Sequence, residues 1–190
     1  FEFSDTTKIG FVSVEKPSFD QPATGTIEVK HGDRFMFRPS DLFLMHPEMF
    51  RRFGPYDLNA LFLQGVPAVV NDQVLSNIRH LTGLRHLIVR NSTITANAVD
   101  TFNCFPQLDN LTLKRLKELD SLTANDAVNP TPYLVKLVGS TSLRQLSVKS
   151  VDLSDDDLKL IAQIPNLKEL TINSNPKVTA KGLSYLPKCK

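Results

Sequence analysis

The strongest constraint on the fold of this chain is an internal repeat in the positions of its apolar residues. Counting from Leu84, apolar side chains follow at offsets 3, 5, 10, 15, 18 and 21, and the next unit begins at offset 24. Counting from Leu143, apolar residues stand at the same offsets. A period of this length is typical of proteins built from stacked units, because one unit cannot bury its apolar face alone.

Five such units account for residues 58–190. They start at Leu58, Leu84, Leu108, Leu143 and Leu167. The first unit contains two extra residues, the last contains one, and the third contains eleven. We expect the extra residues of the third unit to form an insertion at about 115–133, because insertions in repeat proteins emerge as loops.

The apolar period changes within each unit. In the fourth unit, residues 143–148 alternate with period 2, which predicts a short strand with one buried face. Leu158, Ile161 and Ile164 then stand three residues apart, which suits a short helix or 3₁₀ turn. The sequence therefore predicts five strand–helix units in succession.

Polar residues mark where the helical halves begin. The natural N-cap residues are Thr95, Ser154 and Thr179. Three consecutive carboxylates follow one of these caps, in the first helical turn, where the helix dipole favours anions. They are Asp155, Asp156 and Asp157. We interpret this acidic run as a helix start rather than as a cation site.

These units resemble the leucine-rich-repeat family, whose pattern L-x-x-L-x-L is specific when it recurs. The resemblance implies an α/β solenoid, with a curved parallel sheet and short helices on its convex side. One feature departs from the family pattern. The asparagine that the family carries at offset 8, where it hydrogen-bonds loop backbone, occurs only as Asn175. At that offset the other units have Val66, Ser92, Leu116 and Val151.

Residues 81–87, followed by Ile94 and Thr95, are similar to bacterial members of the family with units of about 24 residues. Some of those members are joined to serine/threonine kinases across a membrane. The similarity implies an alternative role, as the ligand-sensing domain of a membrane-anchored bacterial kinase. No kinase motif occurs in this chain, so kinase activity would lie outside it.

Residues 1–57 read as an extended segment followed by a β/α cap over the first unit. We expect a β-hairpin between Thr26–Val29 and Phe35–Phe37, with Gly32 in the turn. Pro47–Phe53 then predicts a short helix that begins with proline and turns aromatic side chains inward. The chain has 12 phenylalanines, and their concentration near the N-terminus indicates an aromatic plug.

The sequence offers little support for catalysis or for a bound cofactor or metal. The four histidines have no metal-ligand spacing, and no nucleophile elbow or phosphate-binding loop occurs. Cys104 and Cys189 stand three units apart, about 14 Å, so we expect two unpaired thiols. A remote alternative is an enzyme with its site in the cap, around His31, Asp33, Arg34 and His46.

The solvent side of the strands is the more informative surface. Offsets 3 and 5 point into the core, so offsets 2, 4 and 6 point to the concave face, with offset 1 beside them. The candidate partner-binding residues are Phe62, Arg85, His86, Ile88, Arg90, Lys114, Arg144, Lys149 and Lys168. Such a positive face predicts an acidic protein partner. The alternative is a solvated face with a chance excess of lysine and arginine, and the insertion is a second candidate binding element.

The overall charge and hydropathy set wider limits. A net charge of +2 is too small to indicate a nucleic-acid partner. No apolar run is long enough to cross a membrane, and no signal peptide is visible. The chain begins with Phe1 rather than methionine, so both a cytoplasmic location and an extracytoplasmic domain of an anchored bacterial protein stay open. The sequence predicts no oligomeric state.

Overall fold

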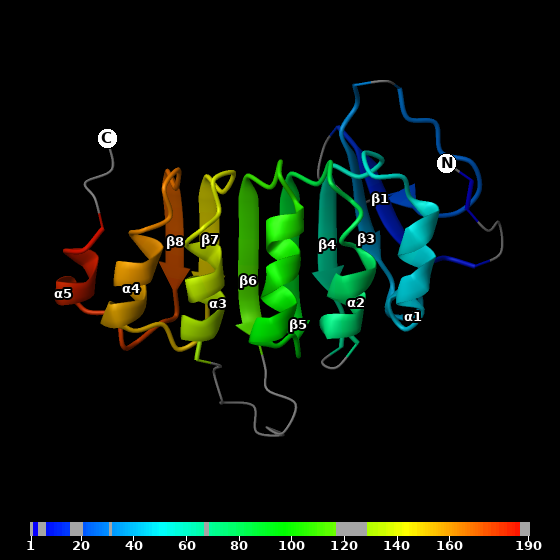
Figure 1. The fold of residues 1–190 in the computed structure, drawn as a ribbon. Helices are drawn as coiled ribbons and strands as arrows, with labels where there is room; N and C mark the ends of the chain where they lie inside the picture. The colour runs from blue at the N-terminus through cyan, green and yellow to red at the C-terminus, as the bar shows by residue number, and fades with distance from the viewer. Residues whose placement is uncertain are drawn as a thin grey trace.

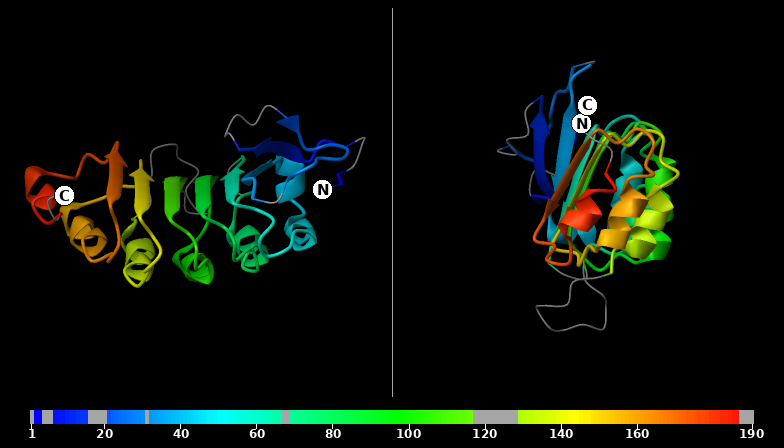
Figure 2. Two further views of the ribbon diagram at one scale, coloured as in Figure 1. Left: turned by 90° about the horizontal axis from the view of Figure 1, so that it is seen from above. Right: turned by 90° about the vertical axis from the view of Figure 1, so that its left-hand side faces the viewer.

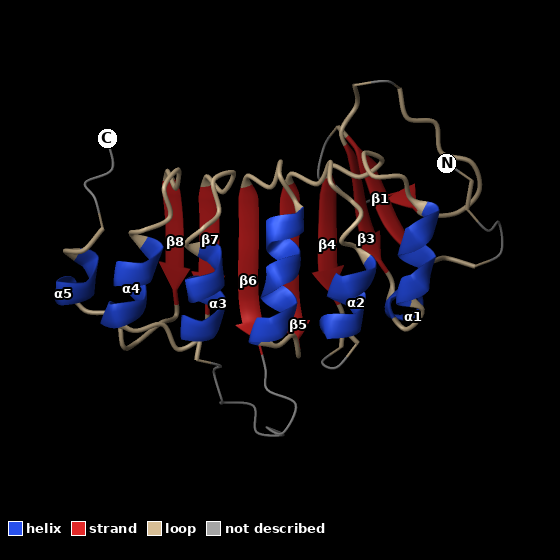
Figure 3. Cartoon of the chain, in the orientation of Figure 1, coloured by secondary structure: helices blue, strands red, loops and turns tan. Residues whose placement is uncertain are grey.

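The fold is a single sheet with helices on one face, as seen in a computed structural model (Figure 1). The structure describes residues 2–3, 7–15, 21–30, 32–66, 69–116 and 129–186. The sheet has eight strands in the order β2-β1-β3-β4-β5-β6-β7-β8. The chain is therefore of the mixed α/β class, and its helices are short (Figure 3).

The strands are β1 (Gly10–Val14), β2 (Gln21–Pro22), β3 (Phe35–Pro39), β4 (Ala60–Gln64), β5 (His86–Ser92), β6 (Asn110–Leu116), β7 (Gln145–Lys149) and β8 (Glu169–Asn173). The α-helices are α1 (Asp41–Leu44), α2 (Asp72–Asn77), α3 (Thr131–Leu137), α4 (Asp155–Ile161) and α5 (Ala180–Leu183). Two further helices are 3₁₀, namely η1 (Pro47–Arg52) and η2 (Ala96–Cys104). Strand and helix alternate from β4 to α5, as the changing apolar period predicts.

Strands β3 to β8 run parallel, and each pairs with the next in sequence. The pairing keeps the register of the sequence repeat, because equivalent offsets face one another across every pair from β4 to β8. The inward leucines at offset 3 form one such line: Leu61, Leu87, Leu111, Leu146 and Leu170. The first four of these are at most 1% exposed.

The main core lies between this sheet and the helices. Helix residues at the predicted offsets, such as Leu75, Leu134 and Leu158, are at most 1% exposed. Burying one such side chain stabilises the fold by about 1.5–3 kcal/mol. The last unit is looser, since Leu170 and Ile172 of β8 are only half-buried. Among the described strands, β8 pairs with β7 alone, so its apolar side chains lack a neighbour on one side.

A left-handed residue lies at or directly after the end of each strand from β5 to β8, always at offset 7. The residues are Asn91 (φ 50°), Arg115 (φ 53°), Ser150 (φ 54°) and Ser174 (φ 57°). This conformation turns the chain from the sheet toward the helix layer in the second to fifth units. None of the four is glycine, and only Asn91 is of a residue type enriched in this conformation, so the sequence carried little sign of it.

The predicted N-caps are confirmed. The side chains of Thr95 and Thr179 accept hydrogen bonds from backbone amides of η2 and α5. Ser154 and Asp157 form a reciprocal capping box at the start of α4. Asn175 also behaves as expected at offset 8, since its Oδ1 accepts from the amides of Val151 and Leu153.

The hairpin expected in the N-terminal cap is wrong. Strand β3 pairs antiparallel with β1, in the segment expected to be extended, and not with Thr26–Val29. Thr26 instead forms an isolated bridge with Glu2. Strand β1 alternates buried and half-buried residues over its first three positions. Because β1 has an apolar face to bury, its pairing with β3 is favourable.

The aromatic plug and the proline-initiated helix of the cap are present. Pro47 begins η1, which is a 3₁₀ helix. Phe37 of β3 and Phe50 of η1 pack around Phe43 of α1, with ring centroids 5.1 Å and 4.9 Å from that of Phe43. These three rings are at most 2% exposed, so they close the N-terminal end of the main core.

The insertion of the third unit spans fewer residues than the expected range of about 115–133, because regular structure extends into both ends of that range. Strand β6 continues to Leu116, and α3 begins at Thr131. The remainder, residues 117–128, lies outside the described residues. None of the helices in the described ranges combines the length and apolar character that a bilayer crossing requires.

Candidate functional site

The candidate site is the face of the sheet opposite the helices, here called the open face. Figure 2 shows the helices on one side of the sheet and strands β1 and β2 lying toward the other side at the N-terminal end. The open face carries the strand residues at offsets 2, 4 and 6, which include six of the nine candidates: Phe62, His86, Ile88, Arg90, Lys114 and Lys149. The register confirms that these residues share one side of the sheet.

Three cations occupy adjacent positions at offset 6. Arg90 of β5 faces Lys114 of β6, which faces Lys149 of β7. We call these three residues the basic row. Neighbouring strands lie about 4.8 Å apart, so each cation has another at close range. Within the described residues, none of the three forms an ion pair with a carboxylate.

Arg90 has few polar contacts within the described residues. Its Nη1 lies 3.5 Å from Oε1 of Gln64, which is a long contact for a hydrogen bond. Its Nε is buried and has no partner among the described residues. The Nε–H of Arg90 is therefore a donor that has lost water without gaining an acceptor, whereas the rest of the half-buried side chain is not shielded from solvent.

A second line of charged residues lies at offset 1, just before the strands. In the first four units the carbonyl group at this position accepts two amide hydrogen bonds from the next unit, as Arg85 O does from Asp109 and Asn110. The line reads Asn59, Arg85, Asp109, Arg144 and Lys168. Asp109 stands between the two arginines, so this line is partly neutralised and the basic row is the more strongly positive feature.

The N-terminal end of the open face is apolar. Met36 of β3 and Ala60 of β4 are 8% and 2% exposed, and they form a small cluster separate from the main core. Phe11 and Phe62 pack against this cluster. The sequence placed Phe62 and Ala60 on this face but not Met36, because the strand that presents Met36 was expected to belong to a hairpin in the cap.

A depression of about 270 Å³ lies over this cluster. Its apolar lining includes Met36, Ala60, Phe62 and Ile88. The polar residues that complete it are Glu15, Arg34, Asn59, His86 and Asn110. We call this feature the apolar depression. Glu15 and Arg34 are joined where the backbone amide of Arg34 donates to the Glu15 carboxylate at 2.8 Å.

His86 lies between the apolar depression and the offset-1 line. Its Nδ1 is 3.8 Å from Oδ1 of Asp109, and both side chains are about one-third exposed, at 37% and 32%. His86 thus faces solvent, as the sequence predicts for offset 2.

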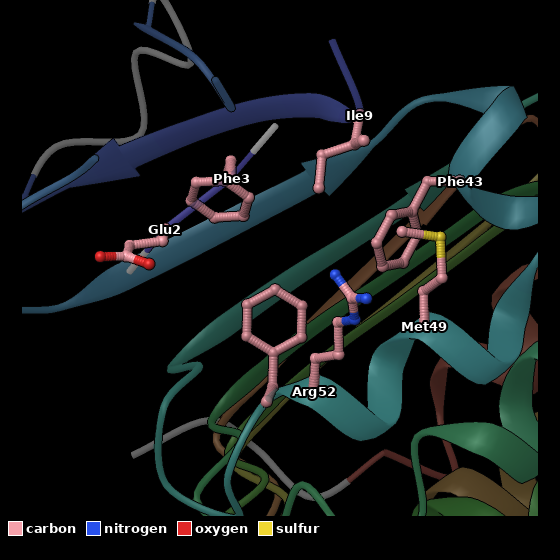
Figure 4. A pocket seen from close by; sticks show the side chains of 7 residues that line it. Glu2, Phe3, Ile9, Phe43, Met49 and Arg52 are labelled. Atoms are coloured by element: carbon pink, nitrogen blue, oxygen red, sulfur yellow. The ribbon is translucent and has the colours of Figure 1, made fainter. Parts of the chain in front are cut away.

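A second cavity of about 190 Å³ lies inside the N-terminal cap (Figure 4). Phe3 and Ile9 form one side, and Phe43, Met49 and Arg52 face them from the helical part of the cap. Its lining does not include Asp33, Arg34 or His46, the described members of the catalytic alternative. His31, the fourth member, lies outside the described residues.

The described members of that catalytic alternative have separate local partners. Asp33 Oδ2 accepts the backbone amide of Lys30, and His46 Nδ1 lies 3.4 Å from Oε1 of the exposed Glu48. The structure thus brings no pair of them together among its described contacts.

The acidic run at the start of α4 is structural. Asp155 accepts from Thr179, Asp156 pairs with Lys159 at 2.7 Å, and Asp157 belongs to the capping box. These hydrogen bonds hold the pKa values of Asp155 and Asp156 below the ordinary range. Within the described ranges, no three histidine, cysteine or acidic side chains are grouped as metal ligands.

Cys104 is a free, half-buried thiol whose Sγ accepts a hydrogen bond from Nε of Arg79 at 3.4 Å. Cys189 lies outside the described residues, so the expected separation of the two thiols stays a prediction.

No protein-family model matches this sequence, and no curated protein matches it either.

Proposed function

We propose that this chain is a leucine-rich-repeat module that binds an acidic protein segment on its open face, without catalysis. The observation that carries the proposal is the basic row. Arg90, Lys114 and Lys149 are cross-strand neighbours, and no carboxylate of the described residues compensates them.

The basic row has no structural benefit of its own. Two like charges about 5 Å apart repel by about 1 kcal/mol or less even in water, and like charges directly opposite in a sheet are unfavourable. An acidic partner turns this repulsion into attraction and is steered toward the face from a distance. The kinase-linked alternative would use the same face, so it shares this argument.

The experiment is a cross-linking pull-down from native cell extract with wild type and two triple variants. The row variant is Arg90→Glu/Lys114→Glu/Lys149→Glu. The control variant, Arg51→Glu/Arg79→Glu/Lys181→Glu, makes the same change in net charge at exposed positions of the helix layer. Folding of all three proteins is checked by circular dichroism and urea unfolding.

We expect one partner to be captured by wild type and by the control variant and to be lost with the row variant. We also expect capture to weaken as salt rises, because surface charges are screened. A partner that the row variant retains, or one insensitive to salt, contradicts binding at the basic row. Turnover of any substrate by the purified wild-type protein contradicts the non-catalytic part of the proposal.

A further inference from the structure

The apolar depression and the basic row lie on the same face and on neighbouring strands. Phe62 and Ile88 of the depression stand at offset 4 of β4 and β5. Arg90 is two residues beyond Ile88 on β5 and points to the same side. An occupant of the depression therefore lies beside the first cation of the row.

We infer that the partner segment is an extended peptide with one large apolar side chain seated in the apolar depression and acidic side chains on the basic row. This inference rests on the proposed function and adds the chemistry of the partner to it. The apolar end of the peptide lies over β4 and β5, and its acidic end lies over β6 and β7.

The size of the depression favours a single side chain. Its volume of about 270 Å³ is below the range of about 300–1,000 Å³ that is typical of pockets for whole small molecules. Its floor is rigid, because Met36 and Ala60 are buried and belong to adjacent paired strands. An aromatic or branched aliphatic side chain would cover Phe62 and Ile88, which are half-buried in the free protein.

The spacing of the two features fixes the spacing expected in the peptide. From Ile88, Lys114 lies one strand away and Lys149 two strands away, each also two residues further along its strand. With strands about 4.8 Å apart and about 3.3 Å per extended residue, these separations correspond to about two to four residues of peptide. The acidic residues should therefore follow or precede the apolar residue at that distance.

The polar rim agrees with a peptide backbone crossing the face. Asn110 Nδ2 donates to Oε1 of Gln145 at 2.5 Å, and His86 lies beside Asp109. His86, Asn110 and Gln145 offer donors and acceptors at offset 2 of β5, β6 and β7, on the side of offset 4 away from the basic row.

The test is a selection of short random peptides displayed on phage, run in parallel against wild type and three variants. The row variant for this test is Arg90→Gln/Lys114→Gln/Lys149→Gln, and the anchor variant is Phe62→Ser/Ile88→Ser. The control, Val135→Ser/Leu183→Ser, removes two exposed apolar side chains from the helix layer, 54% and 50% exposed. Circular dichroism and urea unfolding verify that each variant folds.

We expect wild type and the control to enrich peptides with one large apolar residue and acidic residues two to four positions away, within the range set by about 3.3 Å per residue. The anchor variant should lose the apolar preference and the row variant the acidic one. In fluorescence anisotropy with a selected peptide, alanine in place of its apolar residue should weaken binding about tenfold or more.

Three results would overturn the inference: no enrichment by wild type over the row variant, selected peptides without an apolar residue, or equal binding by the anchor variant. A peptide-independent preference for single-stranded nucleic acid or for anionic vesicles, measured with the same proteins, would also overturn it. If only the anchor variant behaves like wild type, the inference about the apolar residue fails but the proposed function stands, because the pull-down tests dependence on the basic row separately.

Discussion

The carboxylate of Asp155 accepts two hydrogen bonds from Thr179, one from the backbone amide at 2.7 Å and one from Oγ1 at 2.6 Å. Asp72 and Thr95 make the same pair of contacts, both at 2.6 Å. In each case the aspartate is the first residue of one helix and the threonine is the N-cap of the next. The helix layer is therefore tied together by a contact that recurs between units.

This contact predicts a stability effect that can be measured at Thr95. Thr95→Val keeps the branched shape but removes the Oγ1 that donates to Asp72 and accepts from the amide of Asn97. We expect the free energy of unfolding to fall by about 1–2 kcal/mol in urea titrations. Thr112→Val, on the open face, is the matched control and should change stability by less than about 0.5 kcal/mol. Equal effects of the two substitutions would contradict a role for the helix-layer contact.

The same contact predicts a pH effect at the other end of the layer. The side-chain hydrogen bond from Thr179 is the main cause that lowers the pKa of Asp155 below its ordinary value of 3.8. A carboxylate with a lowered pKa in the folded state stabilises the fold above its unfolded pKa, and this contribution is lost as pH falls through the folded pKa. We expect Thr179→Val to cost stability at neutral pH and progressively less between about pH 5 and about pH 2.

Urea unfolding of wild type and Thr179→Val across that pH range measures the effect. The control introduces Thr179→Val into an Asp155→Asn background, where the cost should no longer depend on pH. If the difference in free energy of unfolding between wild type and Thr179→Val stays constant with pH, the Thr179 hydroxyl does not affect the pKa of Asp155.

The left-handed residues at offset 7 predict a stabilising substitution. Ser150 has φ 54° and is not glycine, a conformation that costs a residue with a Cβ about 1 kcal/mol. We expect Ser150→Gly to raise the free energy of unfolding by up to about 1 kcal/mol, after the larger backbone entropy of glycine in the unfolded chain is counted. Ser147→Gly, three residues earlier within β7, should lower it by about 0.5–1 kcal/mol. Urea unfolding would contradict the backbone argument if both changes shifted stability in the same direction.

Two serines with opposite surroundings give a further prediction. Ser92 is fully buried and its Oγ has no partner among the described residues, whereas Ser154 caps α4. Ser92→Ala should leave stability unchanged or raise it by up to about 1 kcal/mol, because a buried unsatisfied hydroxyl is unfavourable. Ser154→Ala should lower it by about 1 kcal/mol. A larger loss of stability for Ser92→Ala than for Ser154→Ala, in thermal or urea unfolding, would contradict an unsatisfied Ser92 hydroxyl.

The repeated strands and helices were predictable from the sequence because the spacing of apolar residues within each unit indicates its secondary structure. The alternation around Leu146 and the three-residue spacing after Leu158 each follow from the burial of one face, and both elements form where expected. The open-face positions of Arg90, Lys114 and Lys149 follow from the same alternation. A side chain's direction in a strand depends on parity alone, so this part of the site needed no tertiary information.

The cap could not be predicted in the same way, because it occurs once and its strands compete for partners. Both Thr26–Val29 and β1 have apolar residues that could pair with β3, and short-range turn signals favoured the nearer segment. In the structure β3 pairs with the more distant strand β1. This pairing places Glu15, which follows β1, in the lining of the apolar depression. Met36 and Ala60 therefore form the floor of the apolar depression, which no pattern within a single segment of the sequence predicts.

The sequence by itself determined the strand–helix order, the residues that face the core and the solvent, and the caps at Thr95, Ser154 and Thr179. These depend on side-chain periodicity and on hydrogen bonds within one turn of chain. Only the tertiary structure decided which strand joins β3, where the apolar depression lies and which aspartate holds which threonine. Those relationships join residues more than 20 positions apart, and their energies depend on packing between units rather than on any one segment.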